Sequence, residues 1–404
     1  MDGEIAIGVP STAGRWRFLA DQHEVKSTSI QDLKTFNSAS KIKEAQFLAL
    51  HVLWKSYAPD EIDLEKEYDI KYRAEDLKDL AWNKHWGPYV QEISKGFDGK
   101  TDLGTFDLLY DFQREIENST LGPQETKKVF FNVTTRLQRK AAGGNNSPPS
   151  TPSRAPRSPN PGSDDLEVGS LENEIKELHI DDMSSVGSPQ SLGVRSVIEP
   201  ISPVTSDEAK WLPLVKDEQI VNTALILLLR GLCMRMPGFT NARWSLERKA
   251  FRIRQHKSLD KECLYEARTD GHLAFFTENA PRSLAILEVK SQVRKDAEPW
   301  MQESAQMAAW IYDEPSTGDR SNFRRCMISQ DRHEIYIIIA TYTKEYVAYL
   351  QGDWDGSSGP FLTMHQIGPF IPNAERHMER LGRIIAALSR QLVHQAKNGN
   401  PCHW

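Results

Sequence analysis

The sequence contains few cysteines and no long apolar run, and each of these absences excludes a class of protein. Four cysteines occur among 404 residues, at long and irregular separations: Cys233, Cys263, Cys326 and Cys402. This spacing matches neither a disulfide framework nor a Cys-x-x-Cys zinc site, so we expect reduced thiols. The longest apolar run, residues 224–229, is far shorter than the roughly 20 residues of a membrane helix. The start, Met1-Asp-Gly-Glu, also lacks the basic residues of a signal peptide. We therefore expect an intracellular protein, cytoplasmic or nuclear, with no membrane partner.

Aromatic residues are missing from the middle of the chain. Residues 141–208 contain no Phe, Trp or Tyr, whereas 28 of these 68 residues are Ser, Pro or Gly. A segment of this composition cannot bury enough apolar surface to offset its loss of conformational entropy, which predicts a disordered linker. The linker has four basic and eleven acidic residues, a net charge of 4 − 11 = −7, against −6 for the whole chain. The remainder is close to neutral, so the overall acidity does not indicate a partner.

The linker contains five Ser-Pro or Thr-Pro pairs, which begin at Ser147, Thr151, Ser158, Ser188 and Ser202. Each exposed hydroxyl is a candidate substrate for a proline-directed kinase, because the added phosphate would change the local charge. A simple spacer rich in Pro and Ser is the alternative interpretation.

Hydrophobic residues make up 39% of the chain and charged residues 26%, as in soluble proteins with some disordered length. The length allows two or three folded units. We expect a mainly helical N-terminal lobe at residues 1–140, the linker at 141–208, and an α/β (α+β) domain at 209–404, in which a central mixed sheet is flanked by helices. Helical patterns cover residues 42–56, 106–116, 216–235, 298–312 and 374–397. Strand patterns cover residues 264–277, 283–290, 334–342, 345–351 and 361–370.

One strand pattern carries charge in an apolar setting. Glu288 and Lys290 follow the apolar residues 284–287, and side chains two positions apart lie on the same face of a strand. A buried charge needs a partner or an ion. The preceding strand supplies Asp270, which a hairpin would bring beside Glu288. Two carboxylates on adjacent strands form a hard-oxygen site suited to Mg²⁺ or Mn²⁺. Lys290 on the same face can activate a metal-bound water, by orienting or deprotonating it, or can stabilise charge on a phosphate.

In this region the sequence resembles the PD-(D/E)XK nuclease superfamily, and in particular a group of fungal proteins with a PD-(D/E)XK nuclease-like domain. The segments that carry the resemblance are DEQIVN (217–222), YEARTDG (265–271), LEVK (287–290) and QESAQM (302–307). They follow the order of the superfamily's core helix, metal-ligand strand, Glu-x-Lys strand and following helix. The resemblance covers about residues 212–351, and Thr269 stands where the superfamily nominally has proline.

The resemblance implies a restriction-endonuclease-like core, with Asp270 and Glu288 as magnesium ligands and Lys290 as the catalytic lysine. It also implies that Glu218 reaches the metal directly or through water, and that Gln302 or Gln306 faces the site. Each of the last three residues also has a structural interpretation. A glutamate at a helix N-terminus complements the helix dipole, and glutamines at i and i+4 can hydrogen-bond each other.

A basic stretch follows the first strong helix of this domain. Residues 243–261 contain seven Lys or Arg residues and two acids, a local charge of +5. Such a stretch is typical of a track for a phosphate backbone, and equally of solvated surface charge. The candidate nucleic-acid contacts in it are Arg243, Arg248, Lys249, Arg252 and Arg254.

The leading hypothesis is therefore metal-dependent phosphodiester hydrolysis of nucleic acid, DNA or RNA, by an Mg²⁺-dependent nuclease. The alternative is a catalytically silent nuclease-like fold that acts as a scaffold for nucleic acid or protein.

Overall fold

The computed structural model describes residues 8–71, 80, 83–95, 101–118, 217–255, 262–278, 281–316, 321–353 and 359–399. All of these residues belong to one compact unit, formed by Met1–Thr126 together with Val197–Trp404. The predicted linker at residues 141–208, including its five candidate phosphorylation sites, lies outside the described residues.

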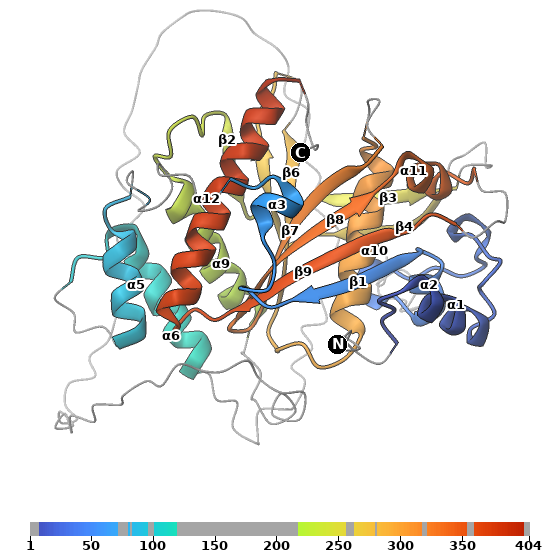
Figure 1. Cartoon of the computed structure of the whole chain (residues 1–404), viewed down its shortest axis with the longest axis horizontal. Helices are drawn as coiled ribbons and strands as arrows, with labels where there is room; N and C mark the ends of the chain where they lie inside the picture. Colours follow the sequence, from blue (N-terminus) through green and yellow to red (C-terminus); the bar gives the residue numbers. More distant parts are fainter. Residues whose placement is uncertain are drawn as a thin grey trace, which may run out of the picture. The chain divides into compact units, whose positions relative to one another are not determined.

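The fold is α+β and is organised by a seven-stranded mixed sheet (Figure 1). Its strands, in spatial order, are β1 (Val52–Tyr57), β9 (Leu362–Phe370), β8 (Glu334–Tyr342), β7 (Phe323–Asp331), β6 (Arg282–Lys290), β5 (Gly271–Phe275) and β2 (Ala242–Ser245). The β1–β9 and β6–β7 pairs are parallel, and the other neighbours are antiparallel. A separate antiparallel hairpin is formed by β3 (Ala250–Arg254) and β4 (Cys263–Arg268).

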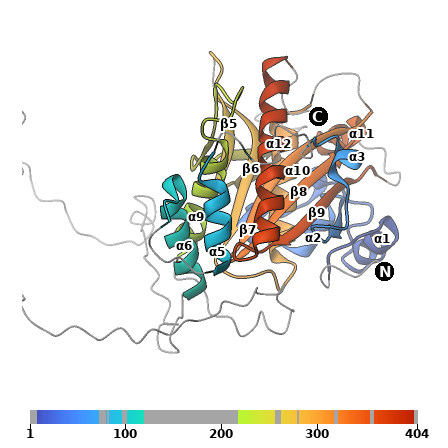
Figure 2. The same ribbon diagram turned by 60° about the vertical axis from the view of Figure 1, so that its left-hand side comes forward.

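Helices cover both faces of the sheet and enclose a hydrophobic core on each side (Figures 1 and 2). The helices packed on one face are α3 (Leu64–Tyr68), α5 (Trp86–Lys95), α6 (Asp107–Asn118), α9 (Glu218–Cys233) and α12 (Glu375–Lys397). Those on the other face are α1 (Ala13–Gln22), α2 (Glu44–Leu48), α10 (Glu298–Asp313) and α11 (Lys344–Leu350). Short 3-10 turns lie at η1 (Ile30–Asp32), η2 (Ala39–Lys41) and η3 (Gly104–Phe106).

The alternation of side chains along β6 determines what each core receives. Leu287 and Val289 belong to the core under α9 and α12, whereas Ile286 belongs to the core under α10. Because successive side chains point to opposite faces, Glu288 and Lys290 share the face of Ile286 and point toward α10. The fold therefore places the pair Glu288 and Lys290 on the face of the sheet that α10 covers.

The N-terminal segment differs from the separate helical lobe that we expected at residues 1–140. Within the described part of that range, most elements are helices, but β1 is a strand of the central sheet, paired with β9. Residues of the same segment also join both hydrophobic cores. The pattern over residues 42–56 suggested one helix, whereas the structure has α2 followed by β1. The apolar residues of β1 are buried by pairing with a strand that is 310 positions later in the chain, which local periodicity does not register.

Several other elements differ from expectation. Residues 345–351, predicted as a strand, form α11, and the strands β2, β3 and β7 had no counterpart in the prediction. The strand expected at 264–277 is two strands, because the chain leaves the hairpin with β3 and enters the large sheet between Arg268 and Gly271. The helices expected at 216–235, 298–312 and 374–397 agree with α9, α10 and α12 to within two residues at each end. No helix among the described residues is both long and apolar enough to span a membrane.

The docking of the N-terminal segment on α9 can be tested at Gly231. A Cβ added at this position would lie 2.6 Å from Cε1 of Phe106. We expect Gly231→Ala to lower the free energy of unfolding by about 1–3 kcal/mol through overpacking, although alanine is the better helix former. Gly87→Ala in α5 is the matched control, because a Cβ there meets nothing within 4 Å. Urea denaturation monitored by circular dichroism measures both, and equal stability of the two variants would contradict this packing.

Candidate active site in the cleft beside β6

Asp270 occupies the junction at which the chain changes sheets. Thr269 still bonds to the β3 hairpin through its backbone N–H, 3.0 Å from the carbonyl oxygen of Lys249. One residue later, the N–H of Asp270 donates to Leu287 in β6 at 3.0 Å. Gly271 is needed next, because a Cβ there would lie 2.5 Å from the backbone oxygen of Ser245. Asp270 is held at this corner, where its Oδ2 accepts a 3.1 Å hydrogen bond from the N–H of Val289.

Glu288 is enclosed between β6 and α10. Its side chain is 2% exposed, and its Oε1 lies 2.6 Å from Nζ of Lys290. Nε2 of Gln302 donates to the same oxygen, and Nε2 of Gln306 donates to Oε2. The two glutamines are one turn apart on α10, so one helix face supplies both donors. Lys290, Gln302 and Gln306 therefore each contact Glu288 directly.

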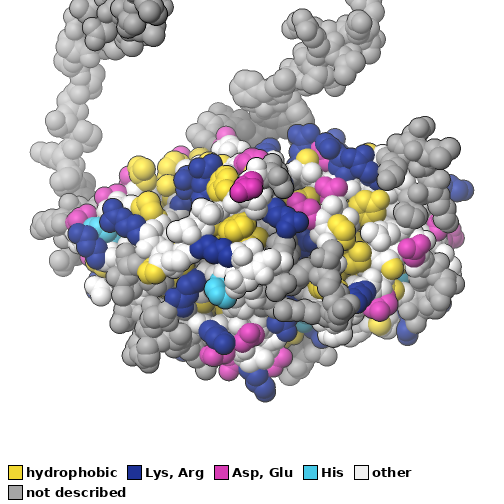
Figure 3. Space-filling view, turned by 90° about the horizontal axis from the view of Figure 1, so that it is seen from above, with side chains coloured by type: hydrophobic (Ala, Val, Ile, Leu, Met, Phe, Trp, Pro, Cys, Tyr) yellow, Lys and Arg dark blue, Asp and Glu magenta, His cyan; other side chains and the backbone are white. Residues whose placement is uncertain are grey.

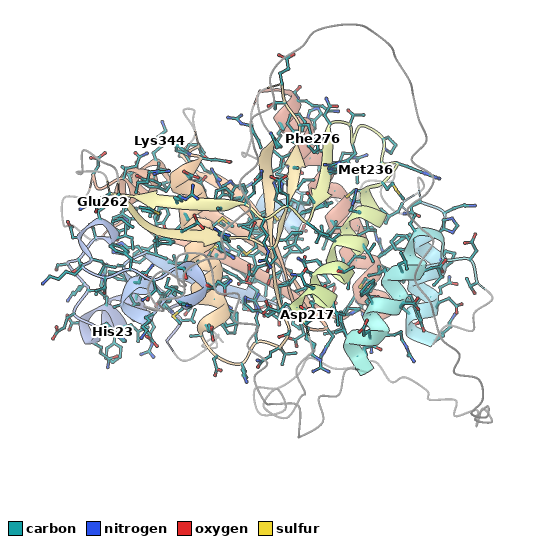
Figure 4. All side chains as sticks on the ribbon, turned by 180° about the vertical axis from the view of Figure 1, so that it is seen from behind. His23, Asp217, Met236, Glu262, Phe276 and Lys344 are labelled. Carbon is teal, nitrogen blue, oxygen red and sulfur yellow. The ribbon has the colours of Figure 1, made fainter. Side chains whose placement is uncertain are left out.

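These groups open into a cleft that also receives Glu218. A cavity of about 370 Å³ is lined by Glu218, Asp270, Glu288, Lys290 and Gln302, together with Arg248 and residues of β4. A second cavity of about 350 Å³ shares Glu218, Lys290 and Gln302 with it, so the two form one continuous cleft. Glu218 enters from the first turn of α9, whose N-cap Asp217 lies at the opposite end of that helix from Met236 (Figure 4).

Burial and neighbouring charges shift the titration of the acidic groups. Burial raises the pKa of Glu288 to about 8, and the Lys290 ammonium opposes this shift. Burial also raises the pKa of Glu218, with Lys290 opposing and Asp270 adding to the shift. Although burial alone lowers the pKa of Lys290, the Glu288 carboxylate raises it above the ordinary lysine range. Lys290 is therefore a cation at neutral pH and acts as a donor.

The cleft contains oxygen donors of the kinds that a divalent cation requires. Carboxylate and amide oxygens are the ligands that Mg²⁺ and Mn²⁺ prefer, and Glu218, Asp270 and Glu288 are among the carboxylates that line the cleft. Two buried amide oxygens beside them, Oε1 of Gln306 and Oδ1 of Asn222, accept no hydrogen bond from the described residues. In the structure, however, Lys290 contacts Glu288, and Nη2 of Arg248 lies 3.1 Å from Oδ1 of Asp270. Within the ranges described, no group of three or more His, Cys, Asp and Glu side chains converges closely enough to form a ready-made metal site. The residues are of the chemical types that bind a hard cation. Two of the carboxylates, those of Glu288 and Asp270, already pair with Lys290 and Arg248.

The basic residues predicted as one track are distributed over several surfaces. Arg248 lies at the cleft, where it pairs with Asp270. Lys249 pairs with Glu247 at 2.7 Å, and Arg252 pairs with Glu266 at 2.6 Å. Arg254, in β3, is close to Asp313 at the end of α10. Arg243 lies in another cavity, with Arg230 and Arg235. The basic stretch at residues 243–261 is thus divided by the turn between β2 and β3. Of its five candidate nucleic-acid contacts, Arg248 alone lines the cleft.

The N-terminal segment contributes to the cleft in a way that the sequence did not indicate. Ser38 and Ser40, on either side of Ala39 at η2, line the cavity beside Asp270, and Ser40 also lines the neighbouring one. Their hydroxyl oxygens are 3.3 Å apart. Nothing in their sequence neighbourhood marks them, because they reach the site only through packing of η2 on α10 and β4.

A second buried charged cluster, also missed, supports the loop that lines the cleft after β6. Arg294 is 9% exposed; its Nη1 donates to Glu303 at 2.9 Å, and its Nε lies 2.6 Å from Oδ2 of Asp331. Its guanidinium also lies over the ring of Tyr336, 4.3 Å from the centroid. Burial raises the pKa of Asp331 to about 7, against the effect of Arg294. These contacts tie residues 291–297 to α10 and β7, beside Gln302.

Comparison with protein-family models, with curated proteins and with solved structures gave no match to this chain. The residues of the cleft are therefore the basis for inferring its chemistry.

The buried Glu288 predicts a pH dependence of stability. Its pKa is higher in the folded chain than in the unfolded chain, so its contribution is fully present below about pH 4.5 and is lost as the pH rises toward 8. In EDTA, we expect wild type to lose stability relative to Glu288→Gln over this window, by at most about 1.4 kcal/mol per pH unit. Denaturant titrations at several pH values measure the difference. A difference that does not vary with pH would refute the raised pKa.

Proposed function

We propose that the protein hydrolyses phosphodiester bonds of nucleic acid in the cleft beside β6, with the help of a divalent cation. The observation that carries the proposal is the convergence of Glu218, Asp270, Glu288 and Lys290 on one cavity. The side chains reach it from the start of α9, the junction before β5, and β6. This is the order of elements in the resemblance to the PD-(D/E)XK nuclease superfamily, so a restriction-endonuclease-like core is part of the proposal.

Asp270 and Glu288 would hold Mg²⁺ or Mn²⁺, assisted by Glu218, with Gln302 and Gln306 fixing the Glu288 carboxylate. The cation would supply a Lewis acid that stabilises negative charge developing on the phosphate. Lys290 remains protonated, because Glu288 raises its pKa. Its ammonium would therefore orient the attacking water by donating a hydrogen bond, or stabilise the phosphate, and would not accept the water's proton. Arg248, which is 54% exposed in its side chain, is free to turn from Asp270 toward a substrate phosphate.

One observation favours the second candidate, a silent scaffold of the same fold. Both proposed metal ligands already contact cations of the chain, which leaves the cleft compensated without a metal. A fold released from catalysis could retain these pairs for stability and bind nucleic acid or protein elsewhere.

Magnesium-dependent cleavage separates the two candidates. We expect wild type to cut plasmid, single-stranded DNA or RNA with Mg²⁺ and to be inactive in EDTA. Lys290→Ala and Glu288→Ala should each reduce the rate about a hundredfold or more, because each removes stabilisation of the transition state. Lys344→Ala is the matched lysine control, since Lys344 lies at the start of α11, away from Asp217 (Figure 4). Equal cutting by wild type and both site variants would point to a contaminant, and tight binding without cutting would favour the scaffold.

Arg248 gives a readout that does not depend on activity. If a cation binds at Asp270, it must displace the Arg248 guanidinium. We therefore expect Mn²⁺ to raise the melting temperature of Arg248→Ala more than that of wild type, and to leave Asp270→Asn almost unchanged. Differential scanning fluorimetry in a Mn²⁺ titration measures the shifts. Identical shifts in all three proteins would exclude Asp270 as a ligand.

A further inference from the structure

A cavity lined by arginines lies at the C-terminal end of α9, the end opposite the cleft. It measures about 260 Å³ and is lined by Arg230, Arg235 and Arg243, with Met234 and Phe239 among the apolar lining residues. The arginines come from the last turn of α9, the turn after it, and β2. Figure 4 places Met236 and Phe276 together at this end of the molecule, with Asp217 at the far end of the helix.

The segments that carry these arginines contain no acidic side chain after Glu218, and Glu278 follows Phe276 by two residues in the neighbouring segment. Residues 219–246 contain no Asp or Glu, and neither do residues 380–399 in the C-terminal part of α12. Arg230, Arg235 and Arg243 are all exposed, and in the described part of the chain none of them forms an ion pair. Three like charges around one cavity repel each other, so an anion bound among them would be stabilised.

The C-terminal part of α12 adds a further cation to this surface. Nζ of Lys397 donates to the carbonyl oxygen of Gly238 at 2.7 Å and to Oγ1 of Thr240 at 2.6 Å, in the loop between α9 and β2. Both acceptors are neutral, so Lys397 keeps its net positive charge there. Figure 3 looks down on the upper end of Figure 1, where Lys and Arg side chains lie among hydrophobic and acidic ones.

Apolar and aromatic groups are exposed next to the arginines. Met234 is 45% exposed and Phe276 is 38% exposed. The guanidinium of Arg243 lies over the ring of Phe276, 4.8 Å from its centroid. An arginine stacked on an exposed aromatic ring forms a flat surface on which a base can stack, with the guanidinium available for the adjoining phosphate. An acidic peptide would satisfy the charge and would make no use of the flat surface.

Helix electrostatics account for one of the three arginines. Arg230 lies in the last turn of α9, where a cation complements the negative end of the helix dipole. Arg235 and Arg243 lie outside the helix, and the dipole effect falls off within the last turn. Their position on the same cavity therefore requires another explanation.

We propose that this arginine cavity binds the backbone of a single-stranded nucleic acid and stacks one of its bases beside Arg243 and Phe276. The inference rests on the proposed function and adds a second contact for the same substrate. Along α9, Glu218 and Arg230 are separated by twelve residues, or about 18 Å at 1.5 Å per residue. This length corresponds to a few nucleotides. Stacking of a base beside Arg243 and Phe276 requires that base to be unpaired, which favours single strands over a duplex.

Binding is measured in EDTA, where metal-dependent cutting does not contribute. The probes are fluorescent oligothymidylate and oligouridylate of about a dozen nucleotides, a matching DNA duplex, and poly-glutamate as competitor. We expect Arg235→Glu with Arg243→Glu to weaken single-strand binding at least tenfold by fluorescence anisotropy. The slope of log affinity against log salt should fall by about 1.4, since each lost phosphate contact removes about 0.7. The control is Arg17→Glu with Lys34→Glu, which makes the same charge change at exposed positions of the N-terminal segment.

Phe276→Ala is the second variant, because it leaves the charge unchanged and removes a partly exposed ring. It should weaken binding of the strand about tenfold without changing the salt slope. Binding by the double variant that equals binding by its control would overturn the inference, as would equal displacement by poly-glutamate or a preference for duplex. If wild type binds the strand through these residues but never cuts it with Mg²⁺, the proposed function fails and this inference stands. If it cuts normally and the arginine variants bind like the control, the inference fails alone.

Discussion

The enclosure of one carboxylate, Glu288, between a central strand and a helix determines the rest of the candidate site. A buried carboxyl group needs hydrogen-bond partners, and Glu288 has Lys290 from its own strand and two amides from α10. The strand positions the carboxylate and the lysine through its pleat, and one helix face positions the glutamines. The junction before β5 then brings Asp270 to the same cavity. Residues from α9, from the junction before β5, from β6 and from α10 therefore meet at this cavity.

Charge in this molecule is arranged in two different ways. In the cleft, carboxylates and cations are matched, so that any added cation has to replace one that the chain provides. At the other end of α9, cations are gathered without carboxylates. A polyanion that spans both regions would meet cations already paired with carboxylates in the cleft. At the other end of α9 it would meet arginines that no carboxylate of that cavity compensates. Under the proposed function, the matched end would orient the substrate and the unmatched end would attract it.

The features that the sequence could predict are those determined by residues close together in the chain. Glu288 and Lys290 are two positions apart, and Gln302 and Gln306 are four apart, so strand and helix periods place each pair without further information. Helices α9, α10 and α12 have a continuous apolar pattern, and their bounds were predicted closely. What the sequence could not provide depends on distant pairing. Ser38 and Ser40 reach the cleft only through the packing of η2, and Arg294 meets Asp331 at the end of β7, a strand that was not anticipated. Residues 345–351 have an apolar pattern too short to distinguish a strand from the short helix α11.

The parallel pairing of β1 with β9 has a consequence for how the protein is made. Val52 is registered against Leu362, so the edge strand of the sheet finds its neighbour 310 residues later in the chain. During synthesis, the nascent segment that contains β1 leaves the ribosome long before β9 exists. Its unpaired amide edge must stay shielded from other chains until β9 has been made. Closure of the sheet at β1 therefore waits for β9, and the large sequence separation of the two strands makes this pairing entropically costly and slow.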